Sequence, residues 1–242
     1  WLTLDAGARV DYHSQTGTEF IPQVGLAFHL PENAEIKAMA SKGFRNPTIR
    51  EMYMFPPQNP DLKPEKLWNY ELSFSQRLMD NRLSYGLNVF YINGENLIIR
   101  LPNPNGSGML NQNSGEIENW GAEANVGYQF NPVWSVMVNY SWLHMENPVL
   151  ASPEHKLYGG VNFRKGRWSA STGIQYVKGL YTDLDAATKE NFVLWDMQGS
   201  FKATNYLSFY VRGENLLAQR YEINAGYPMP KATFMGGVNI NF

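Results

Sequence analysis

The chain contains no cysteine and few charged side chains. Among its 242 residues, Asp, Glu, Lys and Arg make up 17%, against an average of about 25% in soluble domains. The absence of cysteine excludes disulfides, thiolate metal sites and thiol catalysis. The net charge of -2 leaves no basic excess of the kind that nucleic-acid binding requires, so no nucleic-acid partner is expected.

The sequence also has no apolar run near the roughly 20 residues that a membrane-spanning helix needs. A membrane location is then compatible only with a β-barrel, whose alternating strands average out hydropathy along the chain. The chain begins at Trp1, without an initiator Met or a signal peptide. Because an outer-membrane protein is made with a signal peptide, we expect the N-terminus to have been cut.

What the sequence does contain is apolar residues at every second position. From Lys231 to Phe242, the large apolar residues Phe234, Val238 and Ile240 share one face with Phe242. Such alternation is typical of a β-strand with one apolar and one polar face. It recurs along the chain and predicts about twelve strands, at 1–12, 22–30, 34–43, 68–74, 83–101, 120–129, 134–142, 157–164, 168–176, 193–202, 207–214 and 233–242.

The connections between these strands are alternately short and long. Turns are expected at 31–33, 79–82, 131–132, 165–166 and 204–205, and long loops at 13–20, 45–67, 102–115, 146–156, 178–191 and 216–230. Within the second loop, Pro47 to Tyr53 is predicted to form one helical turn. Outer-membrane barrels have short periplasmic turns and long external loops, whereas a soluble sandwich has no reason to sort its loops by length.

Aromatic residues lie at the ends of the apolar faces, where they suit the two membrane interfaces. They are Trp68, Trp120, Trp134, Trp142, Trp168 and Tyr176. We therefore predict an all-β fold, a transmembrane antiparallel β-barrel that forms one domain over residues 1–242, with its long loops outside. Twelve strands are compatible with closure by themselves. They are equally compatible with a contiguous part of a wider barrel, which leaves exposed edges.

Several segments resemble one family. The segment from Ser41 to Tyr53, SKGFRNPTIREMY, is similar to a stretch of TonB-dependent outer-membrane receptors in which a strand ends in a Gly-Phe-Arg-x-Pro turn. Residues 59–66, NPDLKPEK, resemble the stretch that follows it. Residues 213–217, 220–222 and 226–228, with the terminal Phe242, resemble the end of that family. These motifs occur in the family's order over nearly the whole chain.

The resemblance implies a barrel of 22 strands that is plugged by an N-terminal globular domain. Such receptors import a scarce nutrient, such as a ferric siderophore or cobalamin, with energy passed by TonB. This sequence has no plug, no TonB box and too few strands, so we expect it to be the C-terminal portion of the barrel. Its expected partners are outer-membrane lipid, its own plug domain, TonB through that plug, the extracellular nutrient and the barrel-assembly machinery. No cofactor is expected.

The alternative function is a complete twelve-stranded outer-membrane pore or a barrel enzyme. A catalytic site would need a histidine in a Ser or Asp constellation, and the nearest candidate is His144 with Glu146 and His155. Histidines in loops are mostly solvated, so no catalytic role is predicted. Met52, Met54 and His144 have the donor atoms of a soft-metal site, but apolar packing is the preferred interpretation, and no metal site is predicted.

The candidate functional residues fall into three groups. Aromatic and arginine residues of the loops are the predicted ligand contacts: Arg45, Arg50, Tyr53, Phe55, Tyr181, Tyr221 and Tyr227. Charged residues of the polar faces are predicted to line the lumen and to meet the plug rather than the ligand: Glu71, Glu123, Asp196, Arg212 and Glu214. The resemblance implies that Phe242 is the signal that the assembly machinery recognises.

Overall fold

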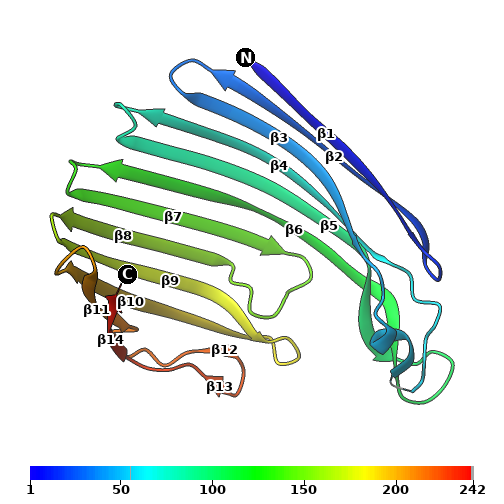
Figure 1. Ribbon diagram of the computed structural model, residues 1–242. Coiled ribbons are helices and arrows are strands. Elements are labelled where there is room, and N and C mark those ends of the chain that lie inside the picture. Colours follow the sequence, from blue (N-terminus) through cyan, green and yellow to red (C-terminus); the bar gives the residue numbers. More distant parts are fainter. Residues whose placement is uncertain (55, 241–242) are drawn as a thin grey trace.

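In the computed structural model, twelve antiparallel strands lie in one curved sheet in the order of the chain (Figure 1). The structure describes residues 1–54 and 56–240. The strands are β1 (Leu2–His13), β2 (Gly17–Leu30), β3 (Ala34–Arg45), β4 (Glu65–Leu78), β5 (Leu83–Pro102), β6 (Met109–Gln129), β7 (Trp134–Met145), β8 (His155–Lys165), β9 (Trp168–Asp183), β10 (Thr188–Lys202), β11 (Leu207–Glu214) and β14 (Thr233–Ile240). The predicted count of twelve is confirmed.

Two additional elements lie outside the sheet. A single π-helical turn, η1 (Arg50–Met54), follows β3, close to the helical turn predicted for Pro47 to Tyr53. A small hairpin of β12 (Glu222–Asn224) and β13 (Tyr227–Pro228) lies between β11 and β14. This hairpin was not predicted, because strands of three and two residues are too short for alternation to be visible.

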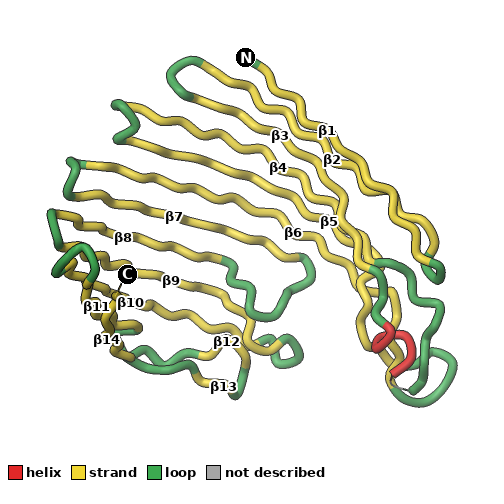
Figure 2. The backbone as a smooth tube through the Cα atoms, in the orientation of Figure 1, coloured by secondary structure: helices red, strands yellow, loops and turns green. Residues whose placement is uncertain are grey.

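Several positions of positive φ in the short turns are occupied by Gly or Asn. Lys165 pairs with Trp168 across a two-residue turn, in which Gly166 has a φ of 59°. Between β2 and β3, Glu32 and Asn33 have φ values of 58° and 54°. Glycine and asparagine adopt this left-handed conformation most readily. Turns and long connections lie at opposite ends of the sheet (Figure 2), which we call the turn end and the loop end.

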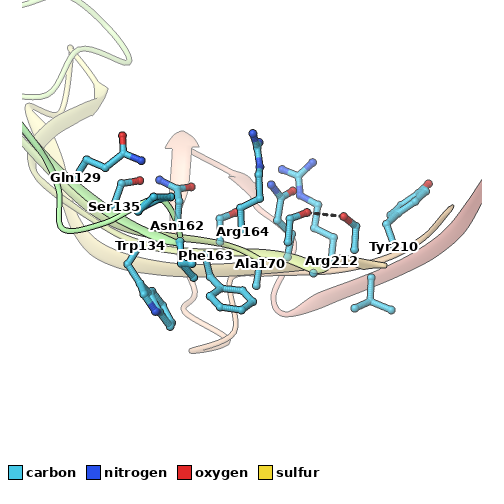
Figure 3. Close-up of a pocket in the computed structure, with 17 residues that line it drawn as sticks. Gln129, Trp134, Ser135, Asn162, Phe163, Arg164, Ala170, Tyr210 and Arg212 are labelled. Atoms are coloured by element: carbon cyan, nitrogen blue, oxygen red, sulfur yellow. Dashed lines mark hydrogen bonds between the residues drawn. The ribbon is translucent and has the colours of Figure 1, made fainter. Parts of the chain in front are cut away.

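The two faces of the sheet differ in composition. Across β7, β8, β9, β10 and β11, one row of cross-strand partners is Trp134, Phe163, Ala170, Gly199 and Val211, and the adjacent row is Ser135, Asn162, Ser171, Gln198 and Arg212. Figure 3 shows Trp134 and Phe163 on the convex side, and Ser135, Asn162 and Arg212 on the concave side. The apolar face predicted for lipid is therefore convex, and the polar face predicted for the lumen is concave.

The expected faces of the last strand are confirmed as far as residue 240. Phe234 pairs with Gly213 and Val238 with Phe209, whereas Thr233 pairs with Glu214. Phe234, Val238 and Ile240 are 75%, 51% and 58% exposed, as is expected for side chains whose solvent is the bilayer. Phe242 lies outside the described residues.

All six predicted loops differ from the structure at one or both ends, and four of them differ substantially in extent or contain strands. The connection predicted at 13–20 is a tight hairpin with only residues 14–16 outside the strands, and the loop predicted at 102–115 spans 103–108. The segment 178–191 is mostly strand, since β9 continues to Asp183 and β10 begins at Thr188, and 216–230 contains the β12–β13 hairpin. The strands continue beyond the apolar belt, where no lipid-facing residues mark them in the sequence.

The sheet has two edges. Its order begins at β1 and ends at β14, and within residues 1–54 and 56–240 these two strands do not pair with each other. The described part of the chain is thus an open barrel wall with unpaired backbone along both edges. No helix in this part is long and apolar enough to cross a membrane.

Candidate functional site

One arginine holds the two ends of the connection between β3 and β4 together. Arg45, the last residue of β3, donates from Nη1 and Nη2 to both carboxylate oxygens of Glu51 at 3.0 Å. It also donates from Nε and Nη2 to Glu65, the first residue of β4, at 2.6 and 2.7 Å. Two bidentate forks on one guanidinium are among the strongest ion-pair geometries. Arg45 therefore joins the start, the helical turn and the end of this connection.

These contacts shift the pKa values of Glu51 and Arg45. The hydrogen bonds from Arg45, together with those from Thr48, lower the pKa of Glu51 to about 2. Thr48 contributes its backbone N–H at 2.7 Å and its hydroxyl at 2.8 Å. The two carboxylates in turn raise the pKa of Arg45. The cluster stays fully ionised at neutral pH, and its donors are directed at protein carboxylates.

The same connection packs against the extended hairpin of β5 and β6. Asn111 donates to the carbonyl of Glu51 at 2.7 Å and accepts at its own carbonyl from Asn59 at 2.8 Å. Asn113 accepts from the backbone N–H of Lys63 at 2.7 Å and donates to its carbonyl at 2.8 Å. Met52 beneath this connection is 1% exposed. Residues 46–54 and 56–64 thus form a cover on the loop end, in which Met52 and Leu62 are almost fully buried.

The ligand contacts predicted on this segment have different environments. Arg50 is exposed, at the start of η1. The hydroxyl of Tyr53 accepts a hydrogen bond at 2.9 Å from Gln15, in the β1–β2 connection. Phe55 lies outside the described residues. Arg45 has a structural role through Glu51 and Glu65, and the structure does not test its predicted contact with a ligand.

A second ordered region lies at the loop end of β9 and β10. Val177, Leu180 and Phe192 are 3%, 5% and 6% exposed, and Tyr221 and Ile223 pack against them. The rings of Phe192 and Tyr221 are 4.2 Å apart. The segment 215–232, which contains the β12–β13 hairpin, therefore covers an apolar cluster on the sheet.

Asn215 fixes the start of this segment. Its backbone N–H donates to Asp196 at 2.8 Å, and its side-chain nitrogen donates to the carbonyls of Gln219 at 2.9 Å and Pro230 at 3.1 Å. Its side-chain oxygen accepts from the N–H of Gln219 at 3.0 Å. Asn215 is 5% exposed and has a φ of 47°, a conformation that asparagine tolerates better than most residues. One side chain thus joins the two ends of the 215–232 connection.

The three predicted ligand contacts of this region are not equivalent. Tyr221 is half-buried against Phe192, and burial, followed by the charges of Asp196 and Glu214, raises its pKa. Tyr181 lies in β9 rather than in a loop, which corrects the prediction, and its ring is 4.3 Å from the ammonium of Lys189. Tyr227 in β13 is 75% exposed. Of these three tyrosines, only Tyr227 has most of its surface exposed.

The concave face forms a groove towards the turn end (Figure 3). Its volume is about 540 Å³, and amide and hydroxyl side chains line it together with Arg164 and Arg212. Ser169 and Ser200 hydrogen-bond each other across it at 2.7 Å. Arg212 forms an ion pair with Glu214 at 2.6 Å. A wall of this composition is suited to water or to a polar partner inside a barrel.

The five predicted lumen residues all lie in the concave set, by their register. Glu71 accepts a hydrogen bond from Asn69 at 2.5 Å, and Glu123 lines a second concave hollow with Lys156. Asp196, Arg212 and Glu214 lie near the start of the 215–232 segment. Asp196 accepts a hydrogen bond from the backbone N–H of Asn215, and Arg212 forms an ion pair with Glu214. The predicted contact of these residues with a plug is not tested by the structure.

The candidate catalytic histidines do not form a constellation in the described part of the chain. His144 lies 3.5 Å from Glu146, both largely exposed, and His155 instead shares a hydrogen bond with Tyr140 at 2.8 Å. Over residues 1–54 and 56–240, no group of three His, Asp or Glu side chains is placed to hold a metal ion. Met52 is packed inside the 46–64 segment, whereas Met54 is 60% exposed.

Sequence reasoning missed the residues that order the loop end. Glu51, Glu65, Asn111, Asn113 and Asn215 were not among the predicted site residues. The available signal was weak: Glu51 follows Thr48 at the spacing of a capping box, and Asn215 lies between two strands. Their partners are up to 60 residues away along the chain, a separation that no local pattern reports.

Residues 1–216 match the family model described as "TonB dependent receptor-like, beta-barrel". The chain belongs to this family. Its place is therefore the bacterial outer membrane.

Individual relatives agree with this assignment. The chain is 25% identical to the vitamin B12 transporter BtuB of Photobacterium profundum, over 98% of the chain and 40% of BtuB. It is 28% identical to an iron-regulated outer membrane virulence protein of Vibrio cholerae, over 66% of the chain and 29% of that protein. The chain thus spans well under half the length of these relatives, which bear the names of a transporter and a virulence protein.

A solved structure shows the same fold. The ferric enterobactin receptor PfeA from Pseudomonas aeruginosa, determined with enterobactin as the Q482A mutant, superimposes with a TM-score of 0.84 at 16% identity. The match covers all of this chain and 43% of the receptor. The open sheet described above is accordingly the fold of one part of such a barrel.

Proposed function

We propose that the chain is the C-terminal part of the barrel wall of a TonB-dependent receptor that takes up a scarce nutrient, such as a ferric siderophore or cobalamin. The observation that carries the proposal is a wall with an apolar convex face and a polar concave groove, in a chain of this family. In the complete receptor, further strands extend both edges to a barrel of 22 strands.

In this proposal, the concave face meets the receptor's own plug domain. Glu71, Glu123, Asp196, Arg212 and Glu214 supply charged and polar contacts to that domain. TonB acts on the barrel only through the plug, by which energy from the inner membrane releases the bound nutrient. Phe242 is recognised by the assembly machinery while the barrel is inserted.

The nutrient binds outside, at the loop end. The predicted contacts Arg50, Tyr53, Tyr181, Tyr221 and Tyr227 belong to the segments that gather there, and Phe55 is a further predicted contact outside the described residues. The two ordered covers, 46–64 and 215–232, hold such side chains on a firm base, which lowers the entropy lost on binding. Arg45 contributes to ligand binding indirectly, because its ion pairs with Glu51 and Glu65 hold the ends of the β3–β4 connection together.

The decisive experiment is growth of a strain that lacks the gene for the full-length receptor, on defined iron and cobalamin sources. Loss of growth on one siderophore or on cobalamin, restored by the intact gene, is the expected result. Unchanged growth and unchanged uptake of every such source would remove the proposed function. A parent gene without a region for a plug domain of some hundred-odd residues would remove it as well.

The orientation can be tested independently, because the chain has no cysteine. Single cysteines at Asn105 and Asp185, in the loop end, are expected to react with an impermeant reagent on intact cells. Cysteines at Asn81 and Asn205, in the turn end, are expected to react only after lysis. The opposite pattern would invert the topology.

The second candidate is a complete twelve-stranded pore or barrel enzyme, supported by the even number of strands. It requires β1 and β14 to pair with each other. A cysteine pair at Leu4 and Val238 that forms a disulfide in the natural protein, together with an intact mass of 27.6 kDa, would favour this candidate. The wide barrel predicts a larger mass and no such crosslink.

A further inference from the structure

Cationic side chains gather on the concave face at the turn end of β8 to β10. By register, Arg164 pairs with Ser169, which in turn pairs with Ser200. Lys202 follows two residues later in β10 and is therefore on the same face. Arg167, in the turn between β8 and β9, lines a hollow of about 320 Å³ together with Arg164 and Lys202. We call Arg164, Arg167 and Lys202 the cationic patch.

Two of these cations are unpaired in the described part of the chain. Arg167 donates to the carbonyl of Ala203 at 3.0 Å. Among residues 1–54 and 56–240, the exposed side chains of Arg164 and Lys202 form no hydrogen bond or ion pair. Figure 3 shows Arg164 projecting from the concave side, next to the groove. The patch thus presents free hydrogen-bond donors and uncompensated charge to the lumen.

The sequence around the patch offers no acidic partner. The stretches 129–138, 160–170 and 199–209 contain neither Asp nor Glu. Glu214, further towards the loop end, is already paired with Arg212 at 2.6 Å. Since most of the predicted plug contacts elsewhere on the concave face are acidic, the charge of the wall changes sign at the turn end of β8 to β10.

The polar groove described above adjoins the patch. Its volume is about 540 Å³, and Arg164, Ser169 and Ser200 line both the groove and the hollow. Amide and hydroxyl side chains continue it along the strands: Asn162, Ser171 and Gln198. A water molecule takes up about 30 Å³ of liquid, so the groove has room for several side chains of a partner.

We propose that the cationic patch receives an acidic segment of the receptor's own plug domain, whose carboxylates pair with Arg164 and Lys202. The proposal rests on the function proposed above, which places a plug against the concave face. A cation that a partner covers loses its hydration, and this loss is costly unless an opposite charge replaces the water. A plug surface that covers Arg164 and Lys202 therefore has to present Asp or Glu at this level.

The position of the patch separates it from the nutrient. It lies at the turn end, whereas the covers 46–64 and 215–232, where the nutrient is proposed to bind, lie at the loop end. The hydroxyl and amide groups of the groove can hydrogen-bond the polar groups of a chain segment beside its carboxylates. A guanidinium adds geometric selectivity, because Arg164 can hold a carboxylate by two parallel hydrogen bonds.

The first experiment is carbodiimide crosslinking of the purified full-length receptor, which joins a lysine amine to a carboxylate in contact with it. Mass spectrometry of the digested protein is expected to find Lys202 joined to an Asp or Glu of the plug domain. Lys165 is the matched control, since it pairs with Trp168 on the convex face at the same end of the sheet and should not be joined to the plug. Lys189, 2.5 Å from Glu154, should be joined to that residue and shows that the reaction works.

The second experiment measures how firmly the plug is held. Arg164→Gln combined with Lys202→Gln should make the amides of the crosslinked plug segment exchange hydrogen about tenfold faster, as expected for the loss of two solvated ion pairs. Because salt screens such pairs, the variant should also lose most of the salt dependence of this exchange. Lys165→Gln with Lys178→Gln removes the same charge from the convex face and is expected to change neither property.

Each outcome has a defined meaning. A crosslink from Lys202 only to carboxylates of the barrel, or none where Lys189 has reacted, would overturn the proposal and leave the patch to water and soluble anions. Equal exchange in the two double variants would overturn it as well. Either result in a receptor with normal nutrient uptake would remove this proposal alone. A crosslink from Lys202 to the plug in a receptor that takes up no nutrient would support the patch and instead overturn the transport function.

Discussion

In the turn-side half of the sheet, each pair of neighbouring strands keeps one unbroken register, whereas the irregularities gather at the loop end. The β5–β6 ladder shifts between Gly94 and Ile98, and the β9–β10 ladder between Thr188 and Phe192. The β2–β3 ladder ends at Gln23 and Ser41, although β2 begins at Gly17. Regular alternation thus describes only the half in which one face meets lipid.

The two halves are also stabilised differently. The turn-side half has backbone ladders and an exposed apolar face whose solvent is lipid. The loop end has a buried cluster around Phe192, the buried side chain of Met52, and charged or amide side chains that connect distant segments. The same strands therefore alternate polar and apolar residues where one face meets lipid. Beyond the lipid they are held by buried side chains and polar contacts, as in a water-soluble domain.

The largest effect is expected from a charge on the convex face of the regular half. Val238→Arg should cost about 2–4 kcal/mol at the bilayer midplane, and less nearer an interface. Asn239→Arg places the same charge on the concave face and should cost little. The measurement is the amount of heat-modifiable, membrane-inserted full-length receptor. Equal amounts of the two variants would contradict the assignment of the faces.

The regular half could be predicted from sequence because its information is local. The position of Phe234, Val238 and Ile240 on one face follows from period 2 alone, and the strand count and the sides of the connections followed from alternation and turn residues. The structure confirms the strand count and the sides of the connections, since the twelve strands of the sheet are neighbours in chain order from β1 to β14.

The loop end could not be predicted to the same extent, for two physical reasons. Beyond the lipid, neither face of a strand must be apolar, so residues 109–115 and 178–183 have no alternation and were taken as loops. The contacts that order the covers are between distant residues, such as Asn111 with Glu51 and Asn215 with Pro230. Arg45 was predicted as a ligand contact, whereas its partners in the structure are Glu51 and Glu65, which composition does not reveal.

The next effect concerns the closure of the first cover. Arg45→Gln removes both forks and leaves Glu51 and Glu65 without their cation. Hydrogen bonds to charged groups contribute about 1.5–3 kcal/mol, so amides of residues 46–64 should exchange hydrogen roughly ten- to a hundredfold faster. Lys63→Gln changes the same charge within the segment and is expected to have no such effect. If both variants exchange alike, the cover does not depend on the ion pairs.

A smaller effect of the same kind should appear with pH. The pKa of Glu51 is lowered from 4.5 to about 2, so its contribution is fully present above about pH 4.5 and is lost as the pH falls towards 2. Exchange in 46–64, corrected for the intrinsic rate, should therefore increase between pH 4.5 and 2 relative to the turn end. Glu51→Gln should weaken this dependence and leave only the part due to Glu65, whose pKa is also lowered by its hydrogen bonds with Arg45. A natural receptor without the increase would contradict the ionised cluster.

The smallest effect on stability, and the sharpest test of the loop end as a binding surface, is expected at Tyr227. Its ring is 75% exposed, so Tyr227→Ala should change the stability of the receptor by no more than about 0.5 kcal/mol. Aromatic residues are nevertheless enriched among those whose truncation weakens binding by more than about 1 kcal/mol, which is roughly a fivefold loss of affinity.

Tyr206, 68% exposed at the turn end, provides the matched control, because Tyr206→Ala deletes a similar exposed ring on the opposite side of the membrane. Binding of the nutrient identified by the growth experiment, measured on the full-length receptor, should weaken for Tyr227→Ala and stay unchanged for Tyr206→Ala. Unchanged affinity in both variants would mean that the β12–β13 hairpin only covers the apolar cluster around Phe192, and that the ligand is held by the 46–64 side of the loop end.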